Sequence, residues 1–182
     1  AAEWFTGEQI SDDAIETILD ELESCMKNIV LIGMPGCGKS TIGKLLAEKT
    51  GRKFEDSDEW IVKLAGKSIP EIFAEDGEEV FRSFETKALE ELGKRSGLVI
   101  ATGGGCVTKE RNYPLLHQNG TIIWLKRNLD QLPTDGRPLS QTTALEEMYR
   151  VRKPLYERFA DHTINSNGTP ADAAEAILKL WE

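Results

Sequence analysis

Cysteine and histidine are both scarce in this chain. Three cysteines, Cys25, Cys37 and Cys106, and two histidines occur among 182 residues, and no C-x-x-C pair is present. A disulfide framework usually has an even set of cysteines, and a zinc site needs clustered Cys and His ligands. The sequence therefore predicts neither, and it favours the reducing environment of the cytoplasm.

Long apolar runs are also missing. The longest, at residues 29–32 and 122–125, fall far short of the roughly 18 residues that indicate a membrane-spanning helix. No basic region precedes an apolar stretch near the first residue, so no secretion signal is visible. We therefore expect no membrane partner. With 7 Pro, 16 Gly and 40% hydrophobic residues, the composition is that of an ordinary globular domain.

Positive charge is in deficit. The chain has 22 Lys and Arg against 31 Asp and Glu, a net charge of −9, which argues against a nucleic-acid surface because phosphate binding draws on excess cations. The deficit is concentrated in residues 1–26, which contain eight acids and no Lys or Arg, and the rest of the chain is nearly neutral. We therefore divide the chain into an acidic segment, residues 1–26, and a main domain, residues 27–182.

The acidic segment carries the pattern of an amphipathic helix. Ser11 can cap its N-terminus, and Asp12 and Asp13 suit the positive first turn. Apolar side chains recur at helical spacing at Ile15, Ile18, Leu19, Leu22 and Met26. We expect this apolar face to pack on the main domain, with a free, frayed segment as the alternative.

Beyond residue 27 the chain alternates apolar runs with helical segments, as α/β proteins do. Continuous apolar runs at 29–32, 98–101 and 121–125 are typical of strands buried on both faces of a parallel sheet. Weaker strand candidates lie at 53–56 and 162–164. Helices are predicted at 39–49, 58–65, 77–95, 108–118, 142–159 and 170–181.

A P-loop follows the first of these strands. Residues 33–40 read G-M-P-G-C-G-K-S, which matches G-x-x-x-x-G-K-[ST] between a strand and a helix. In this motif backbone N–H groups wrap phosphates, Lys39 neutralises their charge and the Ser40 hydroxyl ligates Mg²⁺. The predicted ATP-binding residues are Gly36, Cys37, Gly38, Lys39, Ser40 and Thr41.

The class of P-loop protein follows from the motifs that are missing. The chain shows neither the D-x-x-G and N-K-x-D segments of a GTPase nor four apolar residues ending in Asp, as in motor ATPases. A small-metabolite kinase fits best. Asp56 and Asp58, at the end of the 53–56 strand, supply two carboxylates. One of them can reach the water shell of Mg²⁺ while the other reaches a substrate hydroxyl, with a solvated acidic turn as the alternative.

Several segments taken together resemble shikimate kinase across residues 28–180. They are residues 33–40, 54–58, 72–85, 103–105, 137–139 and 152–156. The resemblance implies a P-loop NTPase fold of the nucleoside-monophosphate-kinase type, with a five-stranded parallel sheet flanked by helices. It also implies phosphate transfer from ATP, with Mg²⁺, to the 3-hydroxyl of shikimate in aromatic amino-acid biosynthesis.

The resemblance also implies a substrate site. Arg82 and Arg152 match the clamp for the shikimate carboxylate, a task that suits the planar guanidinium fork. Asp58 matches the acid that holds the ring hydroxyls and takes the proton of the attacking one. The other substrate-binding residues implied are Gly103, Gly104, Gly105, Phe73 and Phe81, although core packing is the alternative role for the two phenylalanines. Glu78 and Glu85 are expected to orient Arg82.

A lid over ATP is implied between residues 125 and 142. Arg137 would be delivered by this lid to stabilise charge on the transferred phosphoryl group, which makes it the third predicted catalytic residue beside Asp58 and Lys39. The lid, residues 132–137, is short. Asp130 stands where many family members place a basic residue near the adenine.

The first seven residues, A-A-E-W-F-T-G, resemble the closing segment of a shikimate dehydrogenase. This resemblance predicts that the chain is the kinase part of a fused dehydrogenase–kinase, and we expect a monomer. Two alternatives for the function stay open. One is a P-loop kinase for another small polyol acid such as gluconate, and the other is a non-catalytic nucleotide-binding module.

Overall fold

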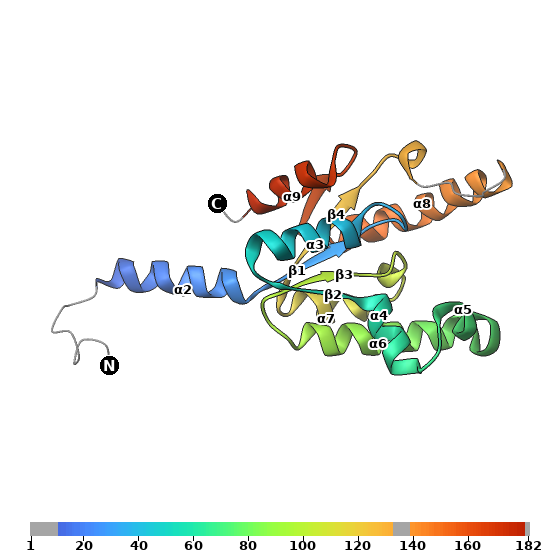
Figure 1. Cartoon of the computed structure of the whole chain (residues 1–182), viewed down its shortest axis with the longest axis horizontal. Helices are drawn as coiled ribbons and strands as arrows, with labels where there is room; N and C mark the ends of the chain where they lie inside the picture. The colour runs from blue at the N-terminus through green and yellow to red at the C-terminus, as the bar shows by residue number, and fades with distance from the viewer. Residues whose placement is uncertain (1–10, 133–138, 181–182) are drawn as a thin grey trace.

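The computed structural model describes residues 11–132 and 139–180, and within these ranges five strands form one parallel sheet. The strand order is β2-β3-β1-β4-β5 (Figure 1). The strands are β1 (Asn28–Ile32), β2 (Lys53–Asp56), β3 (Leu98–Ala101), β4 (Gly120–Lys126) and β5 (His162–Asn165). The predicted α/β fold with a five-stranded parallel sheet is therefore confirmed.

The position of each strand explains its sequence pattern. All five residues of β1 and all four of β3 are buried, and β4 is buried along most of its length. These strands lie inside the sheet, where both faces are covered, so their apolar runs are continuous. The edge strands β2 and β5 are more exposed, which is why their sequence signal is weak.

Helices cover both faces of the sheet. Helix α3 contacts α9 on one side of the sheet, α6 contacts α7 on the other side, and α8 contacts β4 (Figure 1). The bounds are α3 (Lys39–Thr50), α6 (Gly77–Gly93), α7 (Asn112–His117), α8 (Leu139–Phe159) and α9 (Pro170–Leu178). No helix within the described ranges is both long and apolar enough to cross a membrane.

A small lobe inserted between β2 and α6 has its own apolar cluster. It contains α4 (Ser57–Ala65), α5 (Ile69–Glu71) and the π-helix η1 (Ile72–Asp76). Ile61, Ile72, Phe81 and Ala88 form the buried cluster beneath it. The sequence predicted α4, but not α5 and η1, because these two elements are too short to show a helical period.

The acidic segment forms helix α2 (Asp12–Met26), as predicted. Its apolar side chains are 44–56% exposed at Ile15, Ile18, Leu19, Leu22 and Met26. Figure 1 shows α2 extending away from the sheet, and its last residue is tied to the main domain by a 2.7 Å hydrogen bond from Gly97 N to Met26 O. The expectation that this face packs on the main domain is therefore wrong.

Candidate active site

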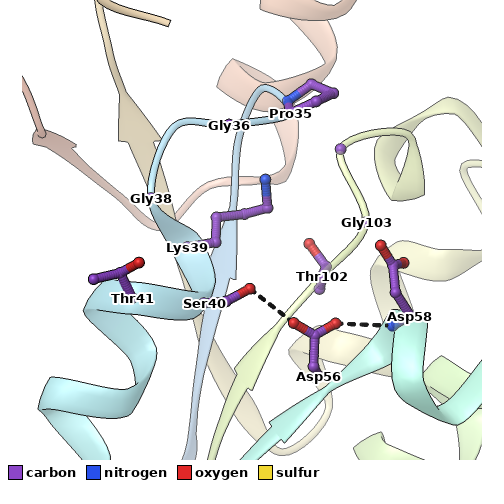
Figure 2. A pocket seen from close by; sticks show the side chains of 11 residues that line it. Pro35, Gly36, Gly38, Lys39, Ser40, Thr41, Asp56, Asp58, Thr102 and Gly103 are labelled. Atoms are coloured by element: carbon purple, nitrogen blue, oxygen red, sulfur yellow. Dashed lines mark hydrogen bonds between the residues drawn. The ribbon is translucent and has the colours of Figure 1, made fainter. Parts of the chain in front are cut away.

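A cleft of about 450 Å³ opens at the carboxyl ends of β1, β2 and β3. Parallel α/β sheets bind ligands at this edge, because the loops that follow neighbouring strands meet there. The lining residues come from three loops, and most of them are labelled in Figure 2: Pro35, Gly36, Gly38, Lys39, Ser40, Thr41, Asp56, Asp58, Thr102, Gly103 and Gly104. The structure thus brings the predicted phosphate-binding residues together with Asp56, Asp58 and two of the three predicted glycines.

The P-loop connects β1 to α3 and presents the start of that helix to the cleft. Gly36 and Gly38 have φ angles of +78° and +99°, which side chains rarely adopt, so the loop needs glycine at both positions. The first residues of α3 line the cleft, so the free N–H groups at the start of this helix can bind an anion there. Cys37 is the exception among the predicted residues, because its side chain is fully buried and does not line the cleft.

Lys39 lies under the P-loop and is only 8% exposed. Its Nζ donates hydrogen bonds to the carbonyl oxygens of Gly33, at 3.0 Å, and Met34, at 2.9 Å. These bonds compensate the buried ammonium group and hold it beside the loop, as Figure 2 shows. A phosphate in the loop would offer Lys39 an acceptor of opposite charge.

Ser40, Asp56 and Asp58 form a short hydrogen-bonded chain across the cleft (Figure 2). Ser40 Oγ donates to Asp56 Oδ2 at 2.8 Å, and Asp56 Oδ1 accepts a 3.0 Å hydrogen bond from the backbone N–H of Asp58. Asp56 is therefore the N-cap of α4 and is oriented toward Ser40. The hydroxyl and carboxylate oxygens of this chain are ligands that Mg²⁺ prefers.

Asp58, whose backbone N–H ends this chain of bonds, lies in the first turn of α4. Its Oδ1 is buried and has no hydrogen-bond partner among the described residues. Burial raises the pKa of Asp58, and the neighbouring Asp56 charge raises it further. Buried acceptors nearly always have a hydrogen-bond partner, so we expect a ligand in the cleft to donate a hydrogen bond to Asp58 Oδ1.

The Gly103–Gly105 turn follows β3 and is crowded by side chains from other segments. A Cβ on the first glycine would lie 2.9 Å from Asp58 Oδ1, and one on the second would lie 2.7 Å from Cδ of Pro35 in the P-loop. A Cβ on the third would overlap the guanidinium of Arg82. Glycine is required here because the three side chains that shape the cleft already occupy this space.

Arg82 is buried on α6 and is held by two carboxylates. Its Nη1 donates to Glu85 Oε2 at 2.9 Å, and its Nε and Nη2 donate to Glu78 Oε1 at 3.3 and 3.1 Å. Both predicted contacts are therefore present. Burial raises the pKa of Glu85 even though Arg82 opposes this effect. Glu85 Oε1 is, like Asp58 Oδ1, buried without a hydrogen-bond partner among the described residues.

Arg152, on α8, reaches the glycine turn from the other side. Its Nη1 donates to Gly104 O at 3.2 Å, and the Tyr156 hydroxyl donates to the same oxygen at 2.6 Å. The Arg152 charge, like that of Arg82, opposes the burial that raises the pKa of Glu85.

The remaining predicted site residues differ in their surroundings. Phe81 is 6% exposed and belongs to the apolar cluster of the small lobe, so its alternative role in core packing is confirmed. Phe73 is 42% exposed and stacks on Phe81 with 4.6 Å between ring centroids. Arg137 lies outside the described residues. Asp130 is exposed in the 3₁₀ turn η3 (Leu129–Gln131).

Three residues of the site were missed by the sequence analysis. Ser57 Oγ is buried and accepts a 2.9 Å hydrogen bond from Gly103 N–H, which fixes the glycine turn against α4. Thr102 lines the cleft and donates from Oγ1 to Leu31 O at 2.9 Å, and Tyr156 holds Gly104 as described above. All three had a signal in the sequence: Ser57 and Thr102 adjoin predicted site residues, and Tyr156 closes the 152–156 segment that resembles the family.

Comparisons with known proteins agree with this geometry. A sequence model described as shikimate kinase matches residues 35–182. A shikimate kinase from Synechococcus sp. (strain CC9605) is 41% identical, over 97% of this chain and 92% of its own. The solved structure of the Acinetobacter baumannii shikimate kinase in complex with shikimate is 38% identical, with a TM-score of 0.79 over 88% of this chain and 96% of its own. The solved structure of the Aquifex aeolicus shikimate kinase is 31% identical, with a TM-score of 0.75 over 84% of this chain and 94% of its own. Because the family model covers most of the chain and the relatives match along nearly their whole length, the chain belongs to the shikimate kinase family.

Proposed function

We propose that this chain transfers the γ-phosphoryl group of ATP to the 3-hydroxyl of shikimate, giving shikimate 3-phosphate and ADP. The observation that carries the proposal is the buried, unpartnered Asp58 Oδ1, which lies in one cleft with the P-loop and Lys39. An acceptor beside a phosphate-binding loop suits a kinase whose nucleophile is a hydroxyl group. Membership of the shikimate kinase family supports shikimate as the alcohol.

The ATP phosphates bind in the P-loop in this proposal. The backbone of Gly36 and Gly38 and the start of α3, including Thr41, contact them, since these residues line the cleft. Lys39 Nζ exchanges its bonds to the Gly33 and Met34 carbonyls for phosphate oxygens. This exchange keeps the ammonium group compensated throughout, because one set of acceptors replaces the other.

Ser40 and Asp56 would hold Mg²⁺, Ser40 directly and Asp56 through a water molecule. The described residues contain no group of three or more His, Cys, Asp or Glu side chains that could hold a metal ion alone. This fits Mg²⁺, which kinases bind with few protein ligands and with the phosphates of the nucleotide. When bound, the ion would neutralise charge on the phosphate oxygens.

Shikimate binds between Asp58 and the two arginines in this proposal. Its carboxylate pairs with Arg82 and Arg152, and its 3-hydroxyl donates to Asp58 Oδ1. The 3-oxygen then forms a bond to the γ-phosphorus, the bond from that phosphorus to the bridging oxygen of ADP breaks, and the hydroxyl proton passes to Asp58. Glu78 and Glu85 fix the Arg82 fork before the substrate arrives, so less conformational freedom is lost on binding.

Arg137 would add a third cation at the reacting phosphate. The transition state of phosphoryl transfer spreads charge over the equatorial oxygens, and an arginine that reaches them stabilises it. We assign this role to Arg137 from the family resemblance of residues 137–139.

A coupled assay of ADP release with three acceptor conditions tests the proposed function. We expect turnover with shikimate and none with gluconate or without an acceptor. Faster turnover with gluconate would favour the other polyol kinase, and no turnover with any acceptor would favour a binding module. Lys39→Ala is the matched control, because it removes the phosphate contact. Turnover should be lost, whereas circular dichroism should show that the variant is still folded.

We also propose that residues 1–26 are separate from a kinase domain formed by residues 27–182, and that the domain works as a monomer. The lack of packing by the α2 apolar face supports the division. The resemblance of residues 1–7 to a shikimate dehydrogenase supports a fused dehydrogenase in the longer protein. The full reading frame and the mass in solution, from light scattering, test these points.

A further inference from the structure

Arg127 has a buried polar atom that the proposed mechanism does not use. It follows β4 directly, and its side chain is half-buried. Its Nε is buried and has no hydrogen-bond partner among the described residues. Asp130 and Glu146 line the adjacent hollow of about 430 Å³ with Arg127, yet neither forms an ion pair with it.

The guanidinium group of Arg127 lies beside the P-loop. A Cβ on Gly38 would be 3.9 Å from Arg127 Nη1 and 3.5 Å from Ile42 Cδ1, so the guanidinium reaches the residue that begins α3. Gly38 itself lines the cleft. The carboxyl end of β4 therefore places a second cation near the loop, on the other side of it from the Gly103–Gly105 turn.

An unpartnered buried donor costs free energy, because it has lost water and gained nothing in exchange. Such groups in a folded protein need an explanation, and a ligand that is absent from the free protein is one of them. For a guanidinium beside a phosphate-binding loop, the complementary ligand is a phosphate oxygen, since the planar fork matches two oxygens of a phosphate.

We propose that Arg127 binds the phosphate chain of the nucleotide at the Gly38 side of the P-loop. This inference rests on the proposed ATP site. It assigns a nucleotide contact to the residue that directly follows β4, ahead of residues 132–137 in the chain. Arg127 would then favour binding of ATP and ADP over nucleosides without affecting shikimate.

Arg127→Met in the whole chain tests the proposal, because methionine keeps the unbranched apolar stem and removes every donor. We expect the affinities for ADP and for tripolyphosphate, measured by calorimetry, to fall about tenfold or more, the usual effect of losing a charge-assisted hydrogen bond. Adenosine and shikimate affinities should stay unchanged. The Tm of the ligand-free variant should equal or exceed that of the wild type, since the unpartnered Nε is gone. Arg127→Lys should recover part of the ADP affinity.

Arg158→Met is the matched control. Arg158 is an exposed arginine that pairs with Glu110 and lines neither the cleft nor the hollow beside Arg127, so its loss should change no affinity. Unchanged ADP and tripolyphosphate affinities in Arg127→Met would overturn the proposal, as would an equal loss for shikimate or a loss confined to adenosine. A wild-type chain that binds ADP but does not phosphorylate shikimate would contradict the proposed substrate only, and the binding series would still decide the role of Arg127.

Discussion

At the scale of single residues, three buried polar atoms in and around the cleft have no hydrogen-bond partner in the described part of the chain. Asp58 Oδ1, Glu85 Oε1 and Arg127 Nε are all buried without a hydrogen-bond partner among the described residues. Each costs stability in the free protein, and each becomes favourable when a ligand supplies the missing donor or acceptor. The site is therefore built for a polar substrate with hydroxyl and phosphate groups.

Asp58→Asn separates the effect of the Asp58 charge on stability from its effect on the rate of phosphoryl transfer. The amide keeps an acceptor oxygen and loses the charge that Asp56 repels, so we expect the Tm of the free protein to rise by about 2 °C or more. The rate constant should fall by roughly 10²- to 10⁴-fold, the range for loss of a general base, while shikimate still binds. Single-turnover kinetics and calorimetry check both parts. Near-normal turnover would reduce Asp58 to a binding residue, and intact ADP affinity is the control.

Arg82→Ala tests the carboxylate clamp. A charge-assisted hydrogen bond is worth about 1.5–3 kcal/mol, so we expect shikimate affinity to fall by about 10- to 150-fold while ADP affinity stays within a factor of two or three. Removing Arg82 also leaves Glu85 buried without its partner, so a thermal melt must accompany the titration. Equal weakening of both ligands in a folded variant would contradict the assignment.

At the scale of elements, the Gly103–Gly105 turn acts as a spacer between three side chains. We expect Gly105→Ala to weaken shikimate at least tenfold, an effect comparable to the loss of one charge-assisted bond, because the new methyl group displaces the Arg82 guanidinium. The backbone of Gly105, with φ of −100°, accepts alanine without strain, so the loss comes from space alone. Shikimate and ADP titrations measure it. Unchanged shikimate affinity would mean that Arg82 can move without loss.

Helix α2, in contrast to the glycine turn, has few contacts with the main domain. Deletion of residues 1–25 keeps the Met26 carbonyl that accepts from Gly97, so we expect the rate constant to stay within about threefold and the Tm to stay within a few degrees. Steady-state kinetics and a thermal melt of the shortened chain test this. A large loss of rate in a folded, shortened chain would show that α2 contributes to the site.

At the scale of the whole molecule, the parallel sheet assembles the site. Because β1, β2 and β3 run in the same direction, the P-loop, the Asp56–Asp58 segment and the glycine turn all emerge at one edge. Helix α6 then supplies Arg82 on one side, and α8 supplies Arg152 on the other. The proposed phosphate and alcohol sites therefore share one edge of the sheet, although their residues come from distant parts of the chain.

The sequence alone determined the strands, the long helices and the P-loop, because each of these depends on local order. Apolar runs predict buried strands, and the glycines, Lys39 and Ser40 of the P-loop are consecutive or nearly so. The motifs of the family, which occur in the expected order, also predicted Asp56, Asp58, Arg82 and Arg152 as site residues.

Contacts between distant segments were decided by the tertiary structure. Ser57 meets Gly103, Tyr156 meets Gly104 and Arg127 meets Gly38 across 46 to about 90 residues, and no periodicity in the sequence records such pairs. The exposed apolar face of α2 is a second feature that the sequence did not predict. Amphipathic spacing says that a helix has an apolar face, whereas only the packing of the whole chain determines what, if anything, covers it.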